Sequence, residues 1–353
     1  MANAFEKHRA RIDAIDEEIL KLVNRRAEHA RAIGQLKNGT VYRPERETQI
    51  LRRLNANNHG PLPGESLTRI FQEIMSACRA VEKPLSVAYL GPPGTYSEEA
   101  AIRHFGGSVP AMACSSIDET LRSVEAGSVD YAVVPVENST EGAVGRTLDL
   151  LLQTPLKIVG EIPVAIHQCL LARQTALKTL RCVYSHPQSL AQCHQWLNQH
   201  LPGVARVNCV SNGEAAQRAA AERGACAIAG KRAAKLYGLK ILAENIEDDP
   251  KNTTRFLVLG RHDAARSGRD KTSLVMTTKN RPGAMLELLA PLAAQRVSMT
   301  KLESRPSRTG QWEYVFFADI EGHQDDARVA KALAGVREKA AFLKVLGSYP
   351  AAL

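Results

Sequence analysis

Residues 86–105 read SVAYLGPPGTYSEEAAIRHF, a short apolar run followed by a turn rich in glycine and proline and then a segment of helical spacing. This order predicts a strand, a turn and a helix. The first turn of such a helix presents backbone N–H groups without partners, and Thr95 and Ser97 add hydroxyl groups beside them. The turn therefore favours a site for a carboxylate or phosphate, while Thr95 and Glu98 also have the spacing of a capping box that would need no ligand.

Further short apolar runs alternate with helical segments as far as residue 261. The order strand, helix, strand predicts α/β layers with largely parallel sheets, and two such series suggest two lobes around a cleft. The run YAVVPVE (131–137) leads through Asn138 and Ser139 into another helix, which repeats the first arrangement. Two helix N-termini at the carboxyl ends of strands are expected to converge on one crevice.

The segment before residue 84 has helical spacing throughout. Residues 6–37 form one predicted helix with an apolar stripe at Ile12, Ile15, Ile19, Leu22, His29, Ile33 and Leu36. Such a helix is roughly 48 Å long, whereas a compact unit of about 85 residues is about 30 Å across. We therefore expect a partner chain to cover the overhanging part. Two further helices, PERETQILRRLN (44–55) and LTRIFQEIMSACRAVE (67–82), complete an all-helical module.

Two cations follow the spacing of the apolar stripe, Arg26 and Lys37. An unpaired charge buried between helices is costly. These side chains either extend to solvent at an end of the bundle or face an anionic ligand in its core. Arg46 and Glu47 open the second helix and Glu82 closes the third, so they would supply the other walls of such a pocket.

The chain after residue 270 has the order β-α-β-β-α-β, which is the ferredoxin-like α+β arrangement. The stretch from Asn280 through Pro282, Gly283 and Ala284 to Met285 lies between the first strand and helix. The stretch Glu303-Ser304-Arg305-Pro306 ends the second strand. A turn and a bulge account for these two stretches as well as a binding site does.

Composition narrows the classes of function. The 46 Lys and Arg outnumber the 37 Asp and Glu, so the net charge of +9 would suit nucleic acid or acidic small molecules. Aromatic residues make up only 5% of the chain and no long basic run occurs, which argues against nucleic acid. The seven cysteines include no CxxC pair, so neither a disulfide framework nor a metal site is expected. Without a membrane-length apolar run or signal-peptide core, the sequence predicts a cytoplasmic protein.

The helical module resembles the all-helical chorismate mutases over residues 5–83. The motifs that carry the resemblance are Arg9-x-x-Ile12-x-x-Ile15-Asp16, Arg25-Arg26, Lys37 and Pro44-Glu45-Arg46-Glu47. In that family the two chains of an interlocked dimer share active sites, in agreement with the overlong helix. The implied rearrangement of chorismate to prephenate stays within one molecule and needs no cofactor, so positioned cations are the main requirement.

The resemblance also implies individual roles in the mutase site. Arg26, and Arg9 from the partner chain, would bind the two carboxylates of chorismate. Lys37 and Glu82 would contact its ether oxygen, and Glu47 its ring hydroxyl. Many members have Gln at the position of Glu82, and a carboxyl group can donate to an ether oxygen only when it is protonated. Arg43 and Cys78 stand where some members have Asp and Ser, and no role is assigned to them.

The middle of the chain resembles the prephenate dehydratases over residues 86–260. Three motifs occur in family order, GPPGTYSEEA (91–100), PVENSTEG (135–142) and NTTRF (252–256), together with YSHPQ (184–188) in the second lobe. The resemblance implies a two-lobed fold like that of periplasmic binding proteins. It implies that Thr254 assists the departure of the ring hydroxyl of prephenate and that Arg255 binds the side-chain carboxylate. The residues expected to line the cleft are Thr95, Ser97, Asn138, Ser139 and Gln188.

The C-terminal segment resembles the ACT domains that follow prephenate dehydratases. There the two motifs form an amino-acid site at a dimer interface, and the implied function is feedback inhibition by phenylalanine. The residues expected at that site are Asn280, Pro282, Gly283, Ala284, Met285, Glu303, Ser304, Arg305 and Pro306.

The sequence thus predicts three domains: an all-α chorismate mutase domain (1–84), a two-lobed α/β dehydratase domain (86–261) and an ACT regulatory domain (271–353). Together they would form a cofactor-free bifunctional enzyme that makes phenylpyruvate, as a homodimer through the helical module or a tetramer. A dehydratase that prefers arogenate and a non-catalytic amino-acid sensor on the same fold are the alternatives. Nucleic-acid binding is a more distant one.

Overall fold

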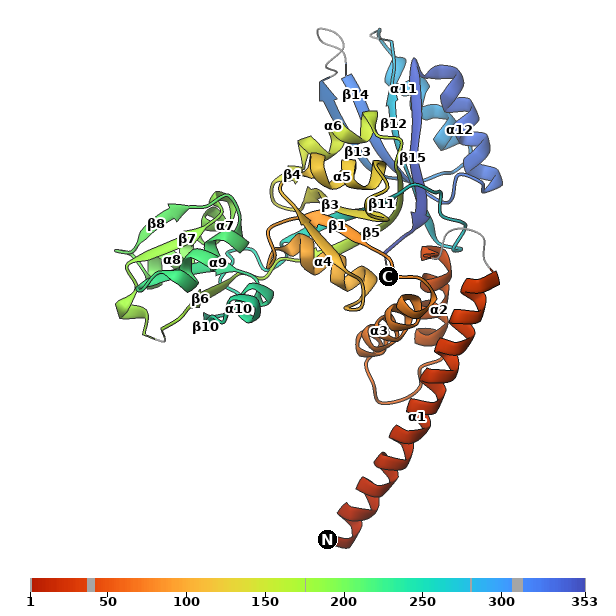
Figure 1. Cartoon of the computed structure of the whole chain (residues 1–353). Helices are drawn as coiled ribbons and strands as arrows, with labels where there is room; N and C mark the ends of the chain where they lie inside the picture. The colour runs from red at the N-terminus through yellow and green to blue at the C-terminus, as the bar shows by residue number, and fades with distance from the viewer. Residues whose placement is uncertain (1, 37–41, 175, 280, 307–313, 353) are drawn as a thin grey trace.

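The computed structural model describes residues 2–36, 42–174, 176–279, 281–306 and 314–352. The chain forms a helical module, a two-lobed α/β region and a C-terminal α+β domain (Figure 1). The second lobe stands apart from the first, whereas the helical module and the C-terminal domain both lie against the first lobe (Figure 1). The predicted multidomain fold class is confirmed.

The helical module consists of α1 (Ala2–Leu36), α2 (Pro44–Ala56) and α3 (Gly64–Glu82). Pro44 begins α2, where a missing N–H and a fixed φ angle suit the first turn. The N-terminal half of α1 extends well beyond α2 and α3 (Figure 1). The apolar stripe on that half is therefore uncovered within one chain: at least half of each side chain is exposed at Ile12, Ile15, Ile19 and Leu22.

The first lobe has a sheet in the order β2-β1-β3-β11-β5, with β4 paired to β3. Its strands are β1 (Val87–Leu90), β2 (Ala111–Cys114), β3 (Tyr131–Asn138), β4 (Gly142–Ala143), β5 (Lys157–Ala165) and β11 (Thr253–Gly260). Its helices are α4 (Tyr96–Phe105), α5 (Ile117–Glu125) and α6 (Gly145–Gln153).

The second lobe has a sheet in the order β10-β6-β9-β7-β8. Its strands are β6 (Cys169–Ala172), β7 (Cys182–Ser185), β8 (Ala205–Asn208), β9 (Ala225–Ala229) and β10 (Lys240–Ala243). Its helices are a 3₁₀ turn (Leu177–Thr179), α7 (Pro187–Gln192), α8 (His194–His200), α9 (Asn212–Ala221) and α10 (Lys231–Tyr237).

Both sheets are mixed, so the prediction of largely parallel sheets is wrong. In the first lobe β1 is parallel to β2 and β3, but β11 is antiparallel to both β3 and β5. Parallel neighbours need a long crossover between them, usually a helix. The chain passes between the lobes directly, from β5 to β6 and from β10 to β11, and the strands at these crossings pair antiparallel.

The C-terminal domain has the predicted ferredoxin-like order. Its elements are β12 (Asp270–Thr277), α11 (Ala284–Ala294), β13 (Met299–Pro306), β14 (Tyr314–Glu321), α12 (Ala327–Lys339) and β15 (Phe342–Pro350). The four strands are arranged as β13-β14-β12-β15. One face of this sheet packs on α11 and α12 through a cluster that includes Leu274, Leu288, Ala318 and Leu333.

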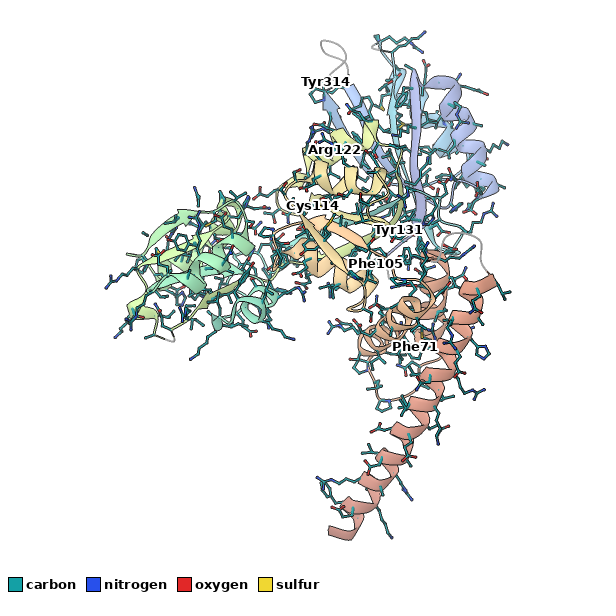
Figure 2. All side chains as sticks on the ribbon, viewed as in Figure 1. Phe71, Phe105, Cys114, Arg122, Tyr131 and Tyr314 are labelled. Carbon is teal, nitrogen blue, oxygen red and sulfur yellow. The ribbon has the colours of Figure 1, made fainter. Side chains whose placement is uncertain are left out.

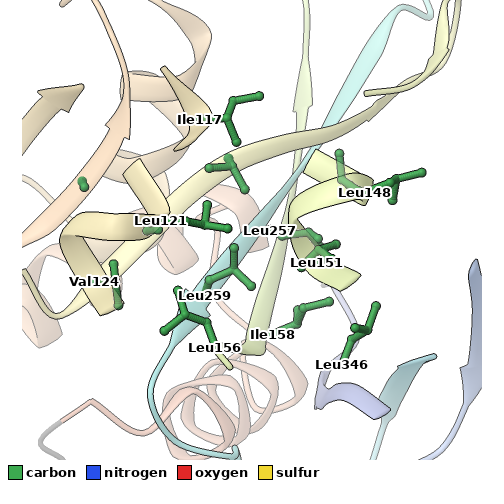
Figure 3. Close-up of a cluster of buried hydrophobic side chains, with 14 of the residues drawn as sticks. Ile117, Leu121, Val124, Leu148, Leu151, Leu156, Ile158, Leu257, Leu259 and Leu346 are labelled. Atoms are coloured by element: carbon green, nitrogen blue, oxygen red, sulfur yellow. The ribbon is translucent and has the colours of Figure 1, made fainter. Parts of the chain in front are cut away.

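The other face of the C-terminal sheet packs on the first lobe and shares a hydrophobic core with it. Leu148, Ile158 and Leu257 of the lobe form one cluster with Leu346 of the C-terminal domain (Figure 3). Phe317 of the same domain belongs to this cluster as well. Each of these side chains is at most 4% exposed. Burial of this kind stabilises by about 1.5–3 kcal/mol per large apolar side chain, so the two parts stabilise each other.

The helical module docks on the first lobe through aromatic side chains. Tyr42 is buried against His104, Phe105 and Tyr131, and the last two lie on the side of the lobe that faces the module (Figure 2). Arg79 at the end of α3 donates to the carbonyl oxygen of Phe105 at 2.6 Å. Burial lowers the pKa of His104 to about 3, so its ring is neutral in this contact.

A glycine permits the close approach of the C-terminal domain to the first lobe, and we predict that Gly347→Ala weakens it. A Cβ atom at this position would lie 2.2 Å from the carbonyl oxygen of Ile158 on β5. Overpacking of this kind costs about 1–3 kcal/mol of unfolding free energy, so the thermal midpoint of the full chain should fall. Gly203→Ala is the control, since a Cβ there meets nothing within 4 Å. Equal midpoints for the two variants would contradict the prediction.

Candidate active sites

A cavity of about 760 Å³ lies between the two lobes of the α/β region. Residues from both lobes and from the crossing segments line it. Among the predicted site residues, those in the lining are Thr95, Ser97, Asn138, Gln188 and Thr254. Segments that are far apart in the sequence thus meet at one cleft between two lobes, as the sequence analysis predicted.

Thr254 and Asn138 form the best-defined polar pair in this cavity. They are paired residues on the antiparallel strands β11 and β3, and Asn138 Nδ2 donates to Thr254 Oγ1 at 2.9 Å. The amide orientation of Asn138 is determined by its surroundings, because its Oδ1 accepts from the backbone N–H groups of Thr140 and Glu141. Asn138 Nδ2 also donates to Asn252 Oδ1 at 2.8 Å. Since Thr254 accepts from Asn138, its own hydroxyl proton is available to a group in the cavity.

The turn before α4 lines the cavity, but its capping box does not form. Thr95 Oγ1 donates to the carbonyl oxygen of Leu90 at 3.2 Å and caps no helical N–H. The Glu98 carboxylate accepts instead from Gly94 N and from the guanidinium of Arg232 on α10. Burial raises the pKa of Glu98, but these hydrogen bonds outweigh it and the net pKa is lowered. Glu98 is thus an anion that ties the two lobes together.

The second predicted helix N-terminus does not face the cavity. After β3 the chain makes a turn and the short strand β4, and α6 begins only at Gly145. The start of α6 faces the C-terminal domain, where the guanidinium of Arg305 lies against Gly145. Ser139 is exposed and is not in the cavity lining; its backbone and Oγ bond to Thr253 instead. The prediction that this helix opens on the crevice is therefore wrong, and the structure does not support Ser139 as a residue of the cavity.

Arg255 is also outside the cavity lining, so the structure does not support its predicted role as the carboxylate-binding residue. Successive side chains of a strand point to opposite faces of the sheet. With Thr254 directed to the cavity, Arg255 points to the opposite face and into the C-terminal domain. Its guanidinium donates to Glu161, Asp319 and the hydroxyl of Tyr349.

Sequence reasoning missed several polar residues of the cavity. Gln168 lies where the chain crosses between the lobes; it is 1% exposed, and its Oε1 accepts no hydrogen bond from the residues that the structure describes. Ser189 and Asn212 line the second-lobe side and are hydrogen-bonded to each other at 2.8 Å. Gln168 directly precedes the apolar run CLLA (169–172), which forms β6. Because this run was not predicted to be a strand, the polar residue at its start was not recognised.

The predicted mutase residues fall into separate groups within one chain. Arg26 is half-buried on α1, and Glu82 at the end of α3 packs against Gly34, where a Cβ would lie 2.5 Å from its Cγ. Arg9 precedes Arg26 by seventeen residues on the same helix, about 26 Å along its axis. Those two cations of one chain therefore cannot bind the same small molecule.

The start of α2 supplies the remaining described residues of this group. Glu47 is paired with the buried Arg79, the same side chain that bonds to the first lobe. Arg46 is exposed, as is Arg43, while Cys78 is buried. Lys37 lies outside the described residues.

The two motifs of the C-terminal domain lie at the same end of its sheet. Ser304 on β13 is paired with Phe316 on β14, which is paired with Met276 near the end of β12. Gly283 follows in the loop after β12, with φ = 77° as the residue before α11, a conformation that favours glycine.

The side chains of these motifs differ in their surroundings. Pro282 and Ser304 are exposed, as is Pro306, while Met285 and Glu303 are half-buried and Ala284 is buried. Arg305 is turned away to the first lobe, where it pairs with Asp149 on α6 at 3.2 Å. Asn280 lies outside the described residues.

No group of three or more His, Cys, Asp or Glu side chains that could hold a metal occurs in the part of the chain that the structure describes. In that same part, no helix combines the length and the apolar character needed to span a membrane.

Three known families match successive parts of the chain. Residues 8–83 match chorismate mutase type II, residues 87–264 match prephenate dehydratase, and residues 272–338 match the ACT domain. A bifunctional chorismate mutase/prephenate dehydratase from Neisseria gonorrhoeae is 53% identical over 350 residues, which cover 98% of this chain and 97% of that protein. Its counterpart from Pseudomonas aeruginosa is 46% identical over 354 residues, with the same coverage.

A solved structure covers the dehydratase and ACT regions together. Prephenate dehydratase from Arthrobacter aurescens in complex with L-Phe superposes with a TM-score of 0.70 at 35% identity, covering 76% of this chain and 90% of that one. The matches cover nearly the whole chain, and their order is the order of the domains in the fold. The chain belongs to the family of bifunctional chorismate mutase/prephenate dehydratases that carry an ACT domain.

Proposed function

We propose that this chain converts chorismate to prephenate in its helical module and prephenate to phenylpyruvate in the cavity between its lobes, under feedback inhibition by phenylalanine. The observation that carries this proposal is the Asn138–Thr254 pair at the interlobe cavity, within a chain that matches the bifunctional family over its whole length.

In the dehydratase step, prephenate loses its ring carboxylate as CO₂ and its ring hydroxyl as water. The electrons of the broken C–C bond complete the aromatic ring as the C–O bond to the hydroxyl breaks, and the departing hydroxide takes up a proton. Aromatisation drives the reaction, so the enzyme must mainly assist the departing oxygen and keep the carboxylate weakly solvated. Thr254 suits the first task because Asn138 occupies a lone pair of Oγ1 and leaves its proton free to donate.

The start of α4 is the best candidate for binding the substrate carboxylate, since Arg255 lies outside the cavity lining. Helix N-termini favour anions through free N–H groups and the helix dipole. Thr95 and Ser97 are located there and line the cavity. Gln188 on α7 would contact the substrate from the second lobe, so binding would draw the lobes together.

In the mutase step, two chains would combine their cations around chorismate. The exposed stripe of α1 and the 26 Å separation of Arg9 from Arg26 support a homodimer in which each site takes Arg9 from the partner. Arg26 and the partner's Arg9 would bind the carboxylates, Lys37 and Glu82 the ether oxygen, and Glu47 the ring hydroxyl, with Arg46 beside it. Cations near the ether oxygen stabilise the negative charge that grows there in the transition state.

Phenylalanine would bind at the two ACT motifs. Gly283 and the start of α11 suit the carboxylate of an amino acid, and Ser304 lies at the same end of the sheet. The L-Phe complex of the A. aurescens relative supports this choice of ligand. Inhibition requires that phenylalanine bind a less active state more tightly. A cytoplasmic location and a tetramer built from two dimers remain predictions.

The direct test is to add chorismate to the pure protein and follow phenylpyruvate, with and without phenylalanine. We expect prephenate to form and then decline as phenylpyruvate accumulates, and phenylalanine to slow the second step. Prephenate and arogenate are then compared as substrates of the second step. A protein that consumes neither chorismate nor prephenate would refute the proposal.

Thr254→Ala should abolish most dehydratase activity and leave the mutase rate unchanged. Loss of a positioned proton donor lowers a rate by about 10²- to 10⁴-fold. Dehydration of prephenate is measured as phenylpyruvate, with the mutase rate of the same preparation as the folding control. Thr253→Ala is the matched variant, because that side chain is not in the cavity lining. Normal dehydration by Thr254→Ala would remove this residue from the mechanism.

Glu82→Gln should change the pH dependence of the mutase. A protonated carboxyl donates to the ether oxygen and a carboxylate does not, so the native rate should fall as the pH rises. The amide of Gln donates at every pH, so the variant should keep its rate on the alkaline side. The measurement is chorismate consumption across the pH range. Identical profiles for the two proteins would show that Glu82 does not act as this donor.

Ile19→Asp should lower the oligomeric state and abolish mutase activity without affecting dehydration. A charge in the centre of the apolar stripe would be buried unpaired in the dimer. Glu17→Ala, two positions away on the opposite face of α1, is the control that should behave as wild type. Sedimentation velocity gives the oligomeric state. Full mutase activity in a monomeric Ile19→Asp protein would exclude shared sites.

A further inference from the structure

Arg255 is a half-buried cation held by both the dehydratase and the ACT domain. Its side chain is 17% exposed. Its Nε donates to Glu161 on β5 at 2.8 Å, and its Nη atoms donate to Asp319 on β14 and to Tyr349 on β15 at 2.5 and 2.8 Å. The three partners are buried: the side chains of Glu161 and Asp319 are 4% and 8% exposed, and Tyr349 is fully buried. A guanidinium presents its donors in a rigid fork, so these contacts fix the orientation of Arg255.

The strand neighbours of the catalytic pair both contact the ACT domain. Thr254 pairs with Asn138 across β11 and β3, and in the next row Arg255 pairs with Glu137. Because side chains alternate along a strand, the first row faces the cavity and the second row faces the ACT sheet. Glu137 forms an ion pair with Lys301 on β13 at 2.6 Å. The hydrogen bond in the cavity thus lies directly behind two charged contacts to the ACT domain.

The charges behind the cavity form one balanced cluster. Arg255 and two lysines, Lys271 and Lys301, face Glu137, Glu161 and Asp319. Ser273 donates to Asp319 and is hydrogen-bonded to Tyr349, which accepts from Arg255. Members come from β3, β5 and β11 on one side and from all four ACT strands on the other. Movement of the ACT sheet would change the partners of Arg255 and Glu137 together.

The pairing between β3 and β11 is also irregular at this point. The pairing of β11 with β3 shifts register between Arg255 and Phe256, so that Phe256 faces Pro135. A bulge interrupts the ladder hydrogen bonds and re-aims nearby side chains. On its other edge β11 keeps regular register with β5 from Thr253 to Val258, so the extra residue lies in β3, between Pro135 and Glu137.

We propose that Arg255, with Glu137, is a positioning residue that holds the Asn138–Thr254 pair in its productive geometry by anchoring β11 and β3 to the ACT sheet. Phenylalanine binding reaches the reaction through this anchorage. The inference rests on the proposed dehydratase activity and its inhibition by phenylalanine, and it adds the side chains that connect them. Misplacement of a donor in the transition state lowers kcat more than it raises KM.

The test compares Arg255→Lys and Asp319→Asn with the control Lys344→Met in the full chain. Lys344 joins the same two domains by donating to the carbonyl oxygens of Leu151, Leu152 and Thr154, and none of these three acceptors lies on β3 or β11. For each protein we measure the thermal midpoint, the mutase rate, the dehydratase kcat and KM, and the phenylalanine concentration for half inhibition. The wild type is assayed first, since failure of the proposed function would show there.

Both cluster variants should lower the dehydratase kcat by about tenfold or more, keep KM within about twofold, and weaken phenylalanine inhibition, while the mutase rate is kept. The double variant should lose little more than either single one, because the two changes break one connection. Lys344→Met should lower only the thermal midpoint. The proposal is overturned if kcat and inhibition stay at wild-type values in Asp319→Asn, or if Lys344→Met changes them as much. Should Arg255→Lys fail to fold, Lys301→Met replaces it under the same criteria.

Discussion

The contact between the ACT sheet and the first lobe is the constraint on which the rest of the structure depends. Apolar side chains of both parts form one core around Ile158 and Leu346, and Gly347 lets β15 approach β5 to backbone distance. In the middle of this contact lies a cluster of charges around Arg255. Buried charges are tolerated only with close and complete partners, so the two surfaces must meet in one register. That register also fixes β11, which carries Thr254.

The second lobe is held much more loosely than the ACT domain. It meets the first lobe through two direct chain crossings, the Glu98–Arg232 pair and contacts of Tyr237 and Gly213 with the turn before α4. Its own hydrophobic cores contain no side chain from another part of the molecule among the described residues. A cavity between a firmly anchored lobe and a loosely connected one suits a ligand that must be enclosed. The polar side chains on the second-lobe side, Gln188 and Asn212, would then close over the substrate.

Particular residues show which parts of the fold and of the sites could be predicted from the sequence. Helical spacing was sufficient for the three N-terminal helices, and the ferredoxin-like order followed from alternation of strands and helices. Thr254 and Asn138 could be identified as site residues because each belongs to a sequence motif that resembles the dehydratase family. Arg255 belongs to the same motif as Thr254, but the face to which a strand side chain points depends on which partners cover each side of the sheet. The mixed sheets were missed for a related reason, since a strand that crosses between lobes has the same local pattern as one that follows a helix.

The length of α1 has a consequence for genetics. In the proposed dimer each mutase site takes Arg26 from one chain and Arg9 from the other, because about 26 Å of helix separates them within a chain. A chain without Arg9 and a chain without Arg26 would each be inactive as a mutase by itself. Mixed dimers of the two would contain one site with both arginines and one site with neither. Two null alleles of the mutase would therefore complement each other in the same cell.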